Sequence, residues 1–194
     1  MILTGSREEK YIDIIKAAIR VFSKHGFDGA KMETIAKETG IGKGTIYEYF
    51  ESKDQLFEEI LKFSVMEYSS GLKKSIDKGE TIEIKLLNCS RFNAEFLNNH
   101  MDIVHMAMQV KMLSKEIRVQ HMAVQAVILR HYQEMVKVAK AKGEFRPDLD
   151  VELATYCIIG TLDQFCKQRV FIDQRPLAEI DHQGIVNVVL KGLK

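Results

Sequence analysis

The chain contains few residues that interrupt helices, since only two prolines, Pro147 and Pro176, occur among its 194 residues. Proline is unfavourable inside a helix because it lacks a backbone donor and clashes with the preceding turn. No segment shows the period-two alternation of a half-buried strand. The sequence therefore predicts an all-α fold with about nine helices.

Cysteine is also scarce. Cys89, Cys157 and Cys166 form an odd set without a C-x-x-C pair, which argues against disulfides and thiolate metal sites. We interpret all three as buried apolar residues in a reducing compartment. No apolar stretch is long enough to span a membrane, and the start, MILTGSREEK, lacks the apolar segment of a signal peptide. We expect a cytoplasmic protein without a membrane partner.

The motifs of common enzyme classes are absent as well. The chain has no G-x-S-x-G nucleophile motif and no glycine-rich phosphate loop. Its six histidines show no metal-ligand spacing, since His100 and His105 are five residues apart and leave one helix face. We therefore expect that the protein is not an enzyme and holds no metal or cofactor.

Positive charge is not in large surplus either. The whole chain has a formal net charge of +1, and residues 1–53 carry nine basic against eight acidic side chains. Bulk charge therefore does not indicate nucleic acid, and only a local arrangement of residues can do so. If the chain binds DNA, we expect weak non-specific affinity and binding concentrated on a defined site.

Residues 31–50, KMETIAKETGIGKGTIYEYF, provide such an arrangement. Good helix formers precede Gly40, which suits the left-handed conformation that closes a helix. In the short helix that follows, Ile46 and Phe50 are four residues apart and share a face, which we expect to pack on Ile35. The segment therefore predicts a helix-turn-helix whose second helix enters the major groove.

The outward face of this second helix carries groups suited to DNA. Thr45 can contact a base edge, and Gly44 allows close approach of the backbone. The lysine and tyrosine side chains nearby suit phosphate oxygens. The predicted DNA contacts are Lys31, Gly42, Lys43, Gly44, Thr45, Tyr47, Glu48, Tyr49 and Lys53. The alternative is a pair of amphipathic helices that only pack a core.

Residues 8–68 closely resemble the N-terminal domain of TetR-type transcriptional regulators. The matching positions are Ile14, Ile15, Ala18, Phe22, Gly26, Phe27, Ile35, Ala36, Gly40, Ile41, Lys43, Gly44, Thr45, Ile46, Tyr47, Tyr49, Phe50, Lys53 and Leu56. The resemblance implies a homodimeric, ligand-responsive repressor of a palindromic operator. It also implies an N-terminal three-helix DNA-binding domain, at residues 1–52, and a helical ligand-binding and dimerisation domain at 53–194.

Two positions depart from the family pattern. Family members often carry Thr or Ser at the start of the second helix, where the hydroxyl caps the helix and touches a phosphate. Lys31 stands near that point and can reach a phosphate but cannot cap. Glu48 lies on the outward face, where a neutral or basic residue is more usual. Its carboxylate either accepts from a cytosine amino group or helps to reject other sequences.

Cap and breaker signals divide the rest of the chain into helices. The predicted helices are Ser6 to Gly26, the helix-turn-helix pair, Ser52 to Gly71 or Gly79, 80–99, a short helix from Asp102, 115–142, 149–171 with Asp148 as its cap, and Pro176 to Leu190.

A ligand is expected among the helices of residues 80–172, where aromatic and methionine side chains gather. Methionine is an adaptable pocket lining, and helical bundles place ligands between helices. The predicted lining residues are Phe92, Phe96, Met106, Met108, Tyr132, Met135, Tyr156 and Phe165. The alternative is that these side chains form an ordinary core.

The run TYCIIGTLDQF at 155–165 is similar to that of fatty-acyl-CoA-responsive members of the family, which implies a hydrophobic acyl effector. An acyl-CoA would require cations at the pocket mouth, and the candidates are Arg91, Lys111, Arg118 and Arg130. A lipophilic cation, as sensed by multidrug-type regulators, would instead require acids, for which Glu95 and Asp163 are candidates.

The last two predicted helices are more apolar than one subunit requires. Packing them against their symmetry mates would make a four-helix dimer interface. The predicted interface residues are Ile158, Thr161, Leu162, Val186, Val189 and Leu190. Alternatively, these residues complete the core of one subunit. A different alternative for function is a ligand-binding dimer whose N-terminal domain no longer binds DNA.

Overall fold

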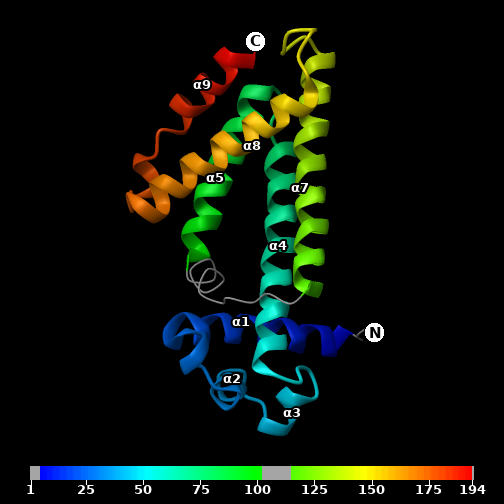
Figure 1. The fold of residues 1–194 in the computed structure, drawn as a ribbon. Helices are drawn as coiled ribbons and strands as arrows, with labels where there is room; N and C mark the ends of the chain where they lie inside the picture. The colour runs from blue at the N-terminus through cyan, green and yellow to red at the C-terminus, as the bar shows by residue number, and fades with distance from the viewer. Residues whose placement is uncertain (1–4, 102–114, 194) are drawn as a thin grey trace. The chain divides into compact units, whose positions relative to one another are not determined.

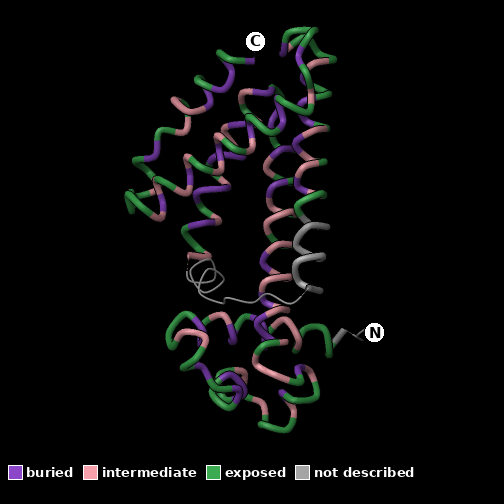
Figure 2. The backbone as a smooth tube through the Cα atoms, viewed as in Figure 1, coloured by how far each residue is buried: buried purple, intermediate pink, exposed green. Residues whose placement is uncertain are grey.

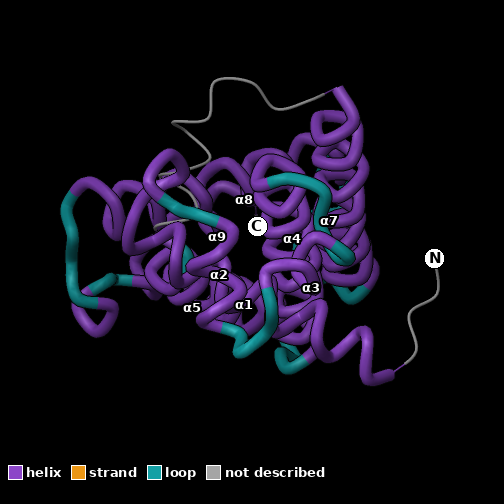
Figure 3. Tube along the Cα trace, turned by 90° about the horizontal axis from the view of Figure 1, so that it is seen from below, coloured by secondary structure: helices purple, strands orange, loops and turns teal. Residues whose placement is uncertain are grey.

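The computed structural model describes residues 5–101 and 115–193, with side chains from residue 6 to 101 and from 125 to 193. Within these ranges every regular element is helical (Figure 1, Figure 3), which confirms the predicted all-α fold. The elements are α1 (Gly5–Gly29), α2 (Met32–Glu38), α3 (Lys43–Tyr47), α4 (Lys53–Asp77), α5 (Ile82–Asn99), α7 (Lys115–Ala141), α8 (Val151–Lys167), η1 (Gln168–Ile172), η2 (Leu177–Glu179) and α9 (His182–Leu193). The short helix predicted from Asp102 lies outside the described residues.

The chain divides into two compact units, and α4 contributes to both. The first unit contains the described residues up to Val65 together with Lys115–Arg118, and the second contains Met66–Met101 together with the described residues from Val119 onward. Each unit has its own buried core, drawn in purple in Figure 2. The domain boundary predicted after residue 52 stays a prediction.

The core of the first unit is built from α1, α2, α3 and the first turns of α4. Ile35 and Ile46 are fully buried and Phe50 is 1% exposed, as their spacing predicted. Gly40 follows α2 with a φ of 68°, a conformation that glycine adopts at little cost. The predicted helix-turn-helix is therefore present, with α3 as its short second helix.

The start of α4 follows its predicted cap. The backbone N–H of Gln55 donates to Ser52 Oγ over 3.1 Å. Of the two predicted ends, the one near Gly79 is right, because α4 continues to Asp77. Gly71 lies inside the helix, and a Cβ at this position would clash with the ring of Phe92 from α5. Glycine here permits close helix packing and does not end the helix.

The cap predicted for α8 was wrong by two residues. Asp150 caps this helix, since its Oδ1 accepts from the N–H of Leu153 over 3.0 Å. Asp148 instead pairs with Arg146 at the surface, because the chain turns there, with the N–H of Leu149 donating to the Arg146 carbonyl. Asp148 and Asp150 are both suited to cap a helix, so the sequence alone does not distinguish them.

The last two helices also differ from their predicted bounds. α8 ends at Lys167 and continues as the π-helical turn η1. Pro176 precedes only the 3₁₀ turn η2, and its ψ of 137° is extended. α9 begins at His182 and runs to Leu193. The long helix α7 ends at Ala141, just before Gly143, as predicted.

The core of the second unit joins five helices. α5 packs on both α8 and α9, and Ser90 Oγ of α5 is hydrogen-bonded to His182 Nδ1 of α9 over 2.8 Å. The buried side chains are mainly aliphatic and include Leu72, Ile76, Leu86, Cys89, Tyr132, Val136, Ile158, Leu162, Val186 and Leu190. Among the described helices, none is long and apolar enough to cross a membrane.

Candidate nucleic-acid interface

The helix α3 presents one face to the core and the other to solvent. Ile46 is its buried residue, whereas Lys43, Gly44 and Glu48 are exposed and Tyr47 is 45% exposed. No atom lies within 4 Å of the point where a Cβ on Gly44 would sit. This side of the helix is therefore open to close approach by a large partner such as the DNA backbone.

Lys43 forms an ion pair with Glu33 of α2. The hydrogen bond and the opposite charge raise the pKa of Lys43 and lower the pKa of Glu33. Both side chains are well exposed, so the pair is a weak surface interaction. A phosphate can replace Glu33 as the partner of Lys43 at little cost.

Lys31 lies directly before α2, in the extended conformation of an N-cap residue. Its side chain makes no capping hydrogen bond, which agrees with the chemistry of an ammonium, a donor without an acceptor. Lys31 is exposed, so its charge remains on the surface of the helix-turn-helix.

Lys53 is held by the protein itself. Its Nζ donates to the carbonyl oxygens of Phe27 (2.7 Å), Asp28 (3.3 Å) and Ala30 (3.3 Å) and lies 4.5 Å from the centre of the Phe27 ring. An ammonium has three donors, and all three are used here. Carbonyls at the C-terminal end of a helix favour a cation. The backbone carbonyls thus hold Lys53 in position, and its predicted phosphate contact stays a prediction.

Tyr49 also has partners inside the first unit. It is half-buried and packs against the core, with its ring centre 6.4 Å from that of Phe50. The guanidinium carbon of Arg7 lies over the Tyr49 ring, 5.4 Å from its centre. Sequence reasoning missed Arg7 because only the packing around Tyr49 brings the start of α1 to this place.

The predicted ligand-lining residues fall into more than one cluster, although Phe92 packs against the core that contains Tyr132 and Met135. Phe92 and Phe96 form an aromatic cluster with Tyr68 and His100, in which Phe96 and His100 are stacked 4.0 Å apart. Tyr132 and Met135 lie in the aliphatic core at 1% and 4% exposure. Tyr156 is 53% exposed, and Phe165 packs in a separate cluster with Cys166. Met106, Met108 and Lys111 lie outside the described residues, and the side chain of Arg118 does so as well.

A polar contact lies beside the aromatic cluster. The Tyr68 hydroxyl donates to Asn93 Oδ1 over 2.8 Å, and Asn93 is 3% exposed. Burial raises the pKa of Tyr68 and Tyr132, and raises that of the Cys89 thiol to about 12. These groups therefore stay neutral at physiological pH, which makes Cys89 an inert core residue.

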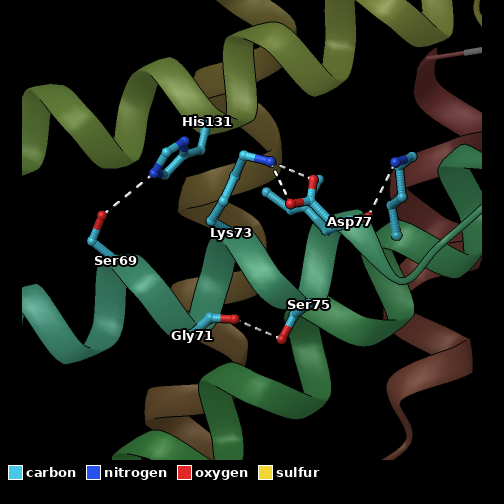
Figure 4. A network of polar contacts seen from close by, with 8 residues as sticks. Ser69, Gly71, Lys73, Ser75, Asp77 and His131 are labelled. Atoms are coloured by element: carbon cyan, nitrogen blue, oxygen red, sulfur yellow. Dashed lines mark hydrogen bonds and ion pairs between the residues drawn. The ribbon is translucent and has the colours of Figure 1, made fainter.

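Two surface grooves are found in the second unit, and neither contains a predicted lining residue. One, of about 790 Å³, runs along the residues that join α7 to α8. The other, of about 460 Å³, lies between α4 and α7 beside Lys74 and Val127. Figure 4 shows its polar wall, where Ser69 Oγ is hydrogen-bonded to His131 Nε2 at 3.4 Å and Lys73 pairs with Asp77.

The charge of this second groove is modest. Burial, and then the charge of Lys73, lowers the pKa of His131, so its ring is neutral at physiological pH. Lys73 is already paired with Asp77. Lys74 also lines the groove and makes none of the ion pairs found among the described residues, so a strongly anionic ligand group would meet one available cation there.

The predicted dimer residues are largely inside the subunit. Ile158, Leu162 and Val186 are fully buried, and Val189 and Leu190 are 7% and 4% exposed. Only Thr161 is partly accessible. A side chain already buried in its own subunit has little surface to offer a partner, so this prediction was wrong about which face of α8 and α9 is available. These five residues instead complete the core of one subunit, as the alternative interpretation stated.

The opposite face of α8 is apolar and exposed. On α8, Leu153 and Tyr156 are 65% and 53% exposed, and Cys157 and Gly160 complete a stripe of one helical face. On α9, Val188 is 65% exposed. Cys157 is therefore not the buried residue that was predicted, whereas Cys89 and Cys166 are buried as expected.

Comparison with known proteins identifies the family. Residues 14–60 match the family of bacterial regulatory proteins described as the tetR family, and residues 57–191 match the C-terminal region of YsiA-like proteins. The chain belongs to the TetR family. It is a DNA-binding transcriptional regulator, and not an enzyme, as the resemblance of its helix-turn-helix implied. The individual DNA contacts stay predictions.

Similar proteins cover nearly the whole chain. The fatty acid metabolism regulator protein of Bacillus subtilis is 26% identical over 188 residues, which are 96% of this chain and 97% of that protein. The fatty acid degradation regulator FadR of Bacillus halodurans has a TM-score of 0.73 at 25% identity and covers 95% of this chain and 100% of its own. The transcriptional regulator FadR of Bacillus subtilis, solved in complex with stearoyl-CoA, has a TM-score of 0.70 at 25% identity, with 93% and 96% covered.

The contacts of Lys53 lead to a test of stability. Lys53→Met should lower the free energy of unfolding by about 1–3 kcal/mol, because three carbonyls at the end of α1 lose a charged donor. Lys43→Met removes only an exposed ion pair and should lower the free energy of unfolding much less than Lys53→Met does. Denaturant unfolding followed by circular dichroism measures both variants. Equal, small losses for the two variants would contradict the positioning role of Lys53.

Proposed function

We propose that the protein is a homodimeric repressor that binds a palindromic DNA operator and releases it when a hydrophobic acyl ligand binds. The observation that carries this proposal is the geometry of α3. Its buried Ile46 fixes one face, and Lys43, Gly44 and Tyr47 are exposed on the other. The proposed direct DNA contacts are Lys31, Gly42, Lys43, Gly44, Thr45, Tyr47 and Glu48, and Tyr49 and Lys53 are proposed to support this face.

Dimerisation is supported by the exposed stripe on α8. A contiguous apolar face on a regulatory protein indicates an interaction site, and a two-fold axis allows one face to pack against itself. Leu153 and Tyr156 would be the large side chains of this contact, with Gly160 allowing close approach of the helices. Val188 extends the apolar surface on α9.

A long-chain acyl-CoA is the proposed effector class. The FadR regulator solved with stearoyl-CoA is similar over 93% of this chain, and fatty acid regulators of Bacillus subtilis and Bacillus halodurans are similar to nearly the whole chain. The second unit also contains an apolar interior with aromatic side chains of intermediate burial at Tyr68, Phe92 and Phe96. An acyl chain requires such a surface, since its affinity comes mainly from removing methylene groups from water.

A lipophilic cation is the less favoured effector. The two acids that would recognise it are placed unsuitably, because Glu95 is exposed and Asp163 pairs with Lys167 over 2.7 Å. A cation bound in an apolar interior would need a buried and available carboxylate or aromatic cage. The loss of DNA binding is also disfavoured, since the outward face of α3 is accessible and carries Lys43.

The switch is proposed to act through α4, which belongs to both units. A ligand that shifts α4 would change the separation of the two recognition helices in the dimer. Half-sites on DNA lie roughly 34–36 Å, or multiples of it, apart, so a shift of a few ångströms breaks their register. The ligand must bind the form that does not bind DNA more tightly, and a 100-fold preference corresponds to about 2.7 kcal/mol.

The DNA-reading surface can be tested with two variants of α3. The wild-type protein would first be used to select duplexes from a random-sequence pool. Thr45→Ala should then change the preferred base at one position of each half-site, at a cost of about 1–3 kcal/mol. Lys43→Ala should weaken all duplexes alike and reduce the salt dependence. Identical selected sequences and identical salt dependence for both variants would show that α3 does not read DNA.

The dimer face can be tested by placing a charge on it. Leu153→Asp should raise the dimer dissociation constant by on the order of 10- to 100-fold, since a carboxylate would be buried at the contact. Met66→Asp is the matched control, because Met66 on α4 is 67% exposed against 65% for Leu153. Analytical ultracentrifugation gives both constants. A wild-type protein that is monomeric at micromolar concentration, or equal dimerisation of both variants, would remove this part of the proposal.

The effector class can be tested through linkage. Stearoyl-CoA should lower the affinity for the selected duplex, and the duplex should lower the affinity for stearoyl-CoA by the same factor. Free coenzyme A and the lipophilic cation tetraphenylphosphonium are the comparison ligands. Titrations with and without the duplex measure both sides of the cycle. Release by the cation but not by stearoyl-CoA would replace the acyl effector with the cationic one.

A further inference from the structure

The cationic side chains of the first unit differ in whether a carboxylate or a backbone carbonyl already compensates their charge. Arg20 pairs with Glu38, Lys43 with Glu33, and Lys62 with Glu59. Lys53 is bound by three backbone carbonyls. Because the N-terminal region has a surplus of only one positive charge over residues 1–53, DNA affinity depends on cations whose charge is not already compensated.

Arg7 is such a cation. No carboxylate among the described residues lies within ion-pair distance of it, and it is exposed in the first turns of α1. Its guanidinium lies over the ring of Tyr49, 5.4 Å from the centre. Tyr49 comes two residues after the end of α3, so the guanidinium is placed beside the recognition helix.

The ring of Tyr49 is a fixed support. Tyr49 is half-buried in the core of the first unit. Its ring lies next to Phe50, with 6.4 Å between centres, and Phe50 in turn contacts Tyr11 of α1 at 5.2 Å. Phe50 itself is 1% exposed. A guanidinium stacked on such a ring loses less conformational freedom when it binds a ligand, because much of its ordering has already occurred.

We propose that Arg7 binds a phosphate of the DNA backbone beside the major groove, and that Tyr49 is the positioning residue that holds it there. The proposal rests on the proposed DNA-binding function. A guanidinium that stacks through its face keeps its N–H edge available, and that edge matches two phosphate oxygens. The contact would fix the orientation of α3 without reading sequence.

The test uses full-length variants and two DNA probes. One probe is the duplex that the wild-type protein selects from a random pool, and the other is an unselected duplex of equal length. Arg7→Ala removes the contact, and Arg7→Lys keeps only the charge. Tyr49→Phe keeps the ring, whereas Tyr49→Leu removes it. Arg146→Ala, which loses an arginine from the second unit, is the control for net charge.

Arg7→Ala should weaken binding to both probes by about 3- to 10-fold, because a phosphate contact carries no sequence preference. The slope of log affinity against log salt should fall by about 0.9 per subunit. Arg7→Lys should keep the salt dependence of the wild type but bind DNA more weakly. Lysine retains the charge but cannot form the two parallel hydrogen bonds of a guanidinium. Tyr49→Phe should match the wild type. Arg146→Ala should change neither the affinity nor the slope.

The role of Tyr49 is separated by a double-mutant cycle. Tyr49→Leu should weaken DNA binding in the wild-type background and have no further effect in the Arg7→Ala background, because its effect passes through Arg7. Additive losses would overturn the positioning role. Thermal unfolding of each variant, without DNA, identifies losses that come from unfolding of the domain.

The outcomes distinguish this proposal from the function on which it rests. If the wild-type protein selects no duplex, the proposed DNA-binding function fails, and the role of Arg7 fails with it. If a duplex is selected and Arg7→Ala binds it with wild-type affinity and slope, only the role of Arg7 is overturned.

Discussion

The burial of Ile46 fixes the direction of α3, because a helix of five residues cannot maintain itself. Helix nucleation is costly, and isolated helices shorter than about 12–15 residues are marginal in water. The recognition helix therefore takes its conformation from the core formed by α1, α2 and α4. Ile46 and Phe50 are part of that core. The Nζ of Lys53 donates to backbone carbonyls at Phe27 and Ala30, where the chain passes from α1 to α2. The residues proposed to face DNA are therefore positioned by the core of the first unit.

The charges of the first unit are nearly balanced. With a net surplus of one over residues 1–53, the first unit has little long-range attraction for a polyanion. Ion pairs such as Lys43–Glu33 hold the cations in place until a phosphate replaces the carboxylate. Non-specific DNA would displace such pairs with little compensation, whereas an operator adds base contacts. A nearly neutral domain thus favours a defined site over bulk DNA.

Local signals predicted much of this fold. Ser52 and Gly40 mark helix ends through short-range hydrogen bonding and backbone preference, and both act as predicted. Asp148 failed because Asp150, two residues later, gives the same capping signal. The partners of Lys53 could not be predicted, since its carbonyls lie 23 to 26 residues away in the sequence. Long side chains take their partners from the tertiary structure.

The dimer face shows a second limit of sequence reasoning. α8 is apolar on two sides, with Ile158 and Leu162 inside and Leu153 and Tyr156 outside. Each pair has helical spacing, so the period of the pattern does not say which side the subunit buries. Only the packing of α5 on α8 decides it. For the same reason the predicted ligand residues that the structure describes divide among the core, an aromatic cluster beside it, a separate cluster at Phe165 and the exposed Tyr156.

Gly71 and Phe92 cannot vary independently. The ring of Phe92 occupies the space that a methyl group on residue 71 would fill, and its neighbours Tyr68 and Phe96 hold it there. In evolutionary terms the two positions behave as one site. A side chain at 71 requires the aromatic ring at 92 to move or to be lost, so packing between α4 and α5 couples the substitutions that the two positions accept.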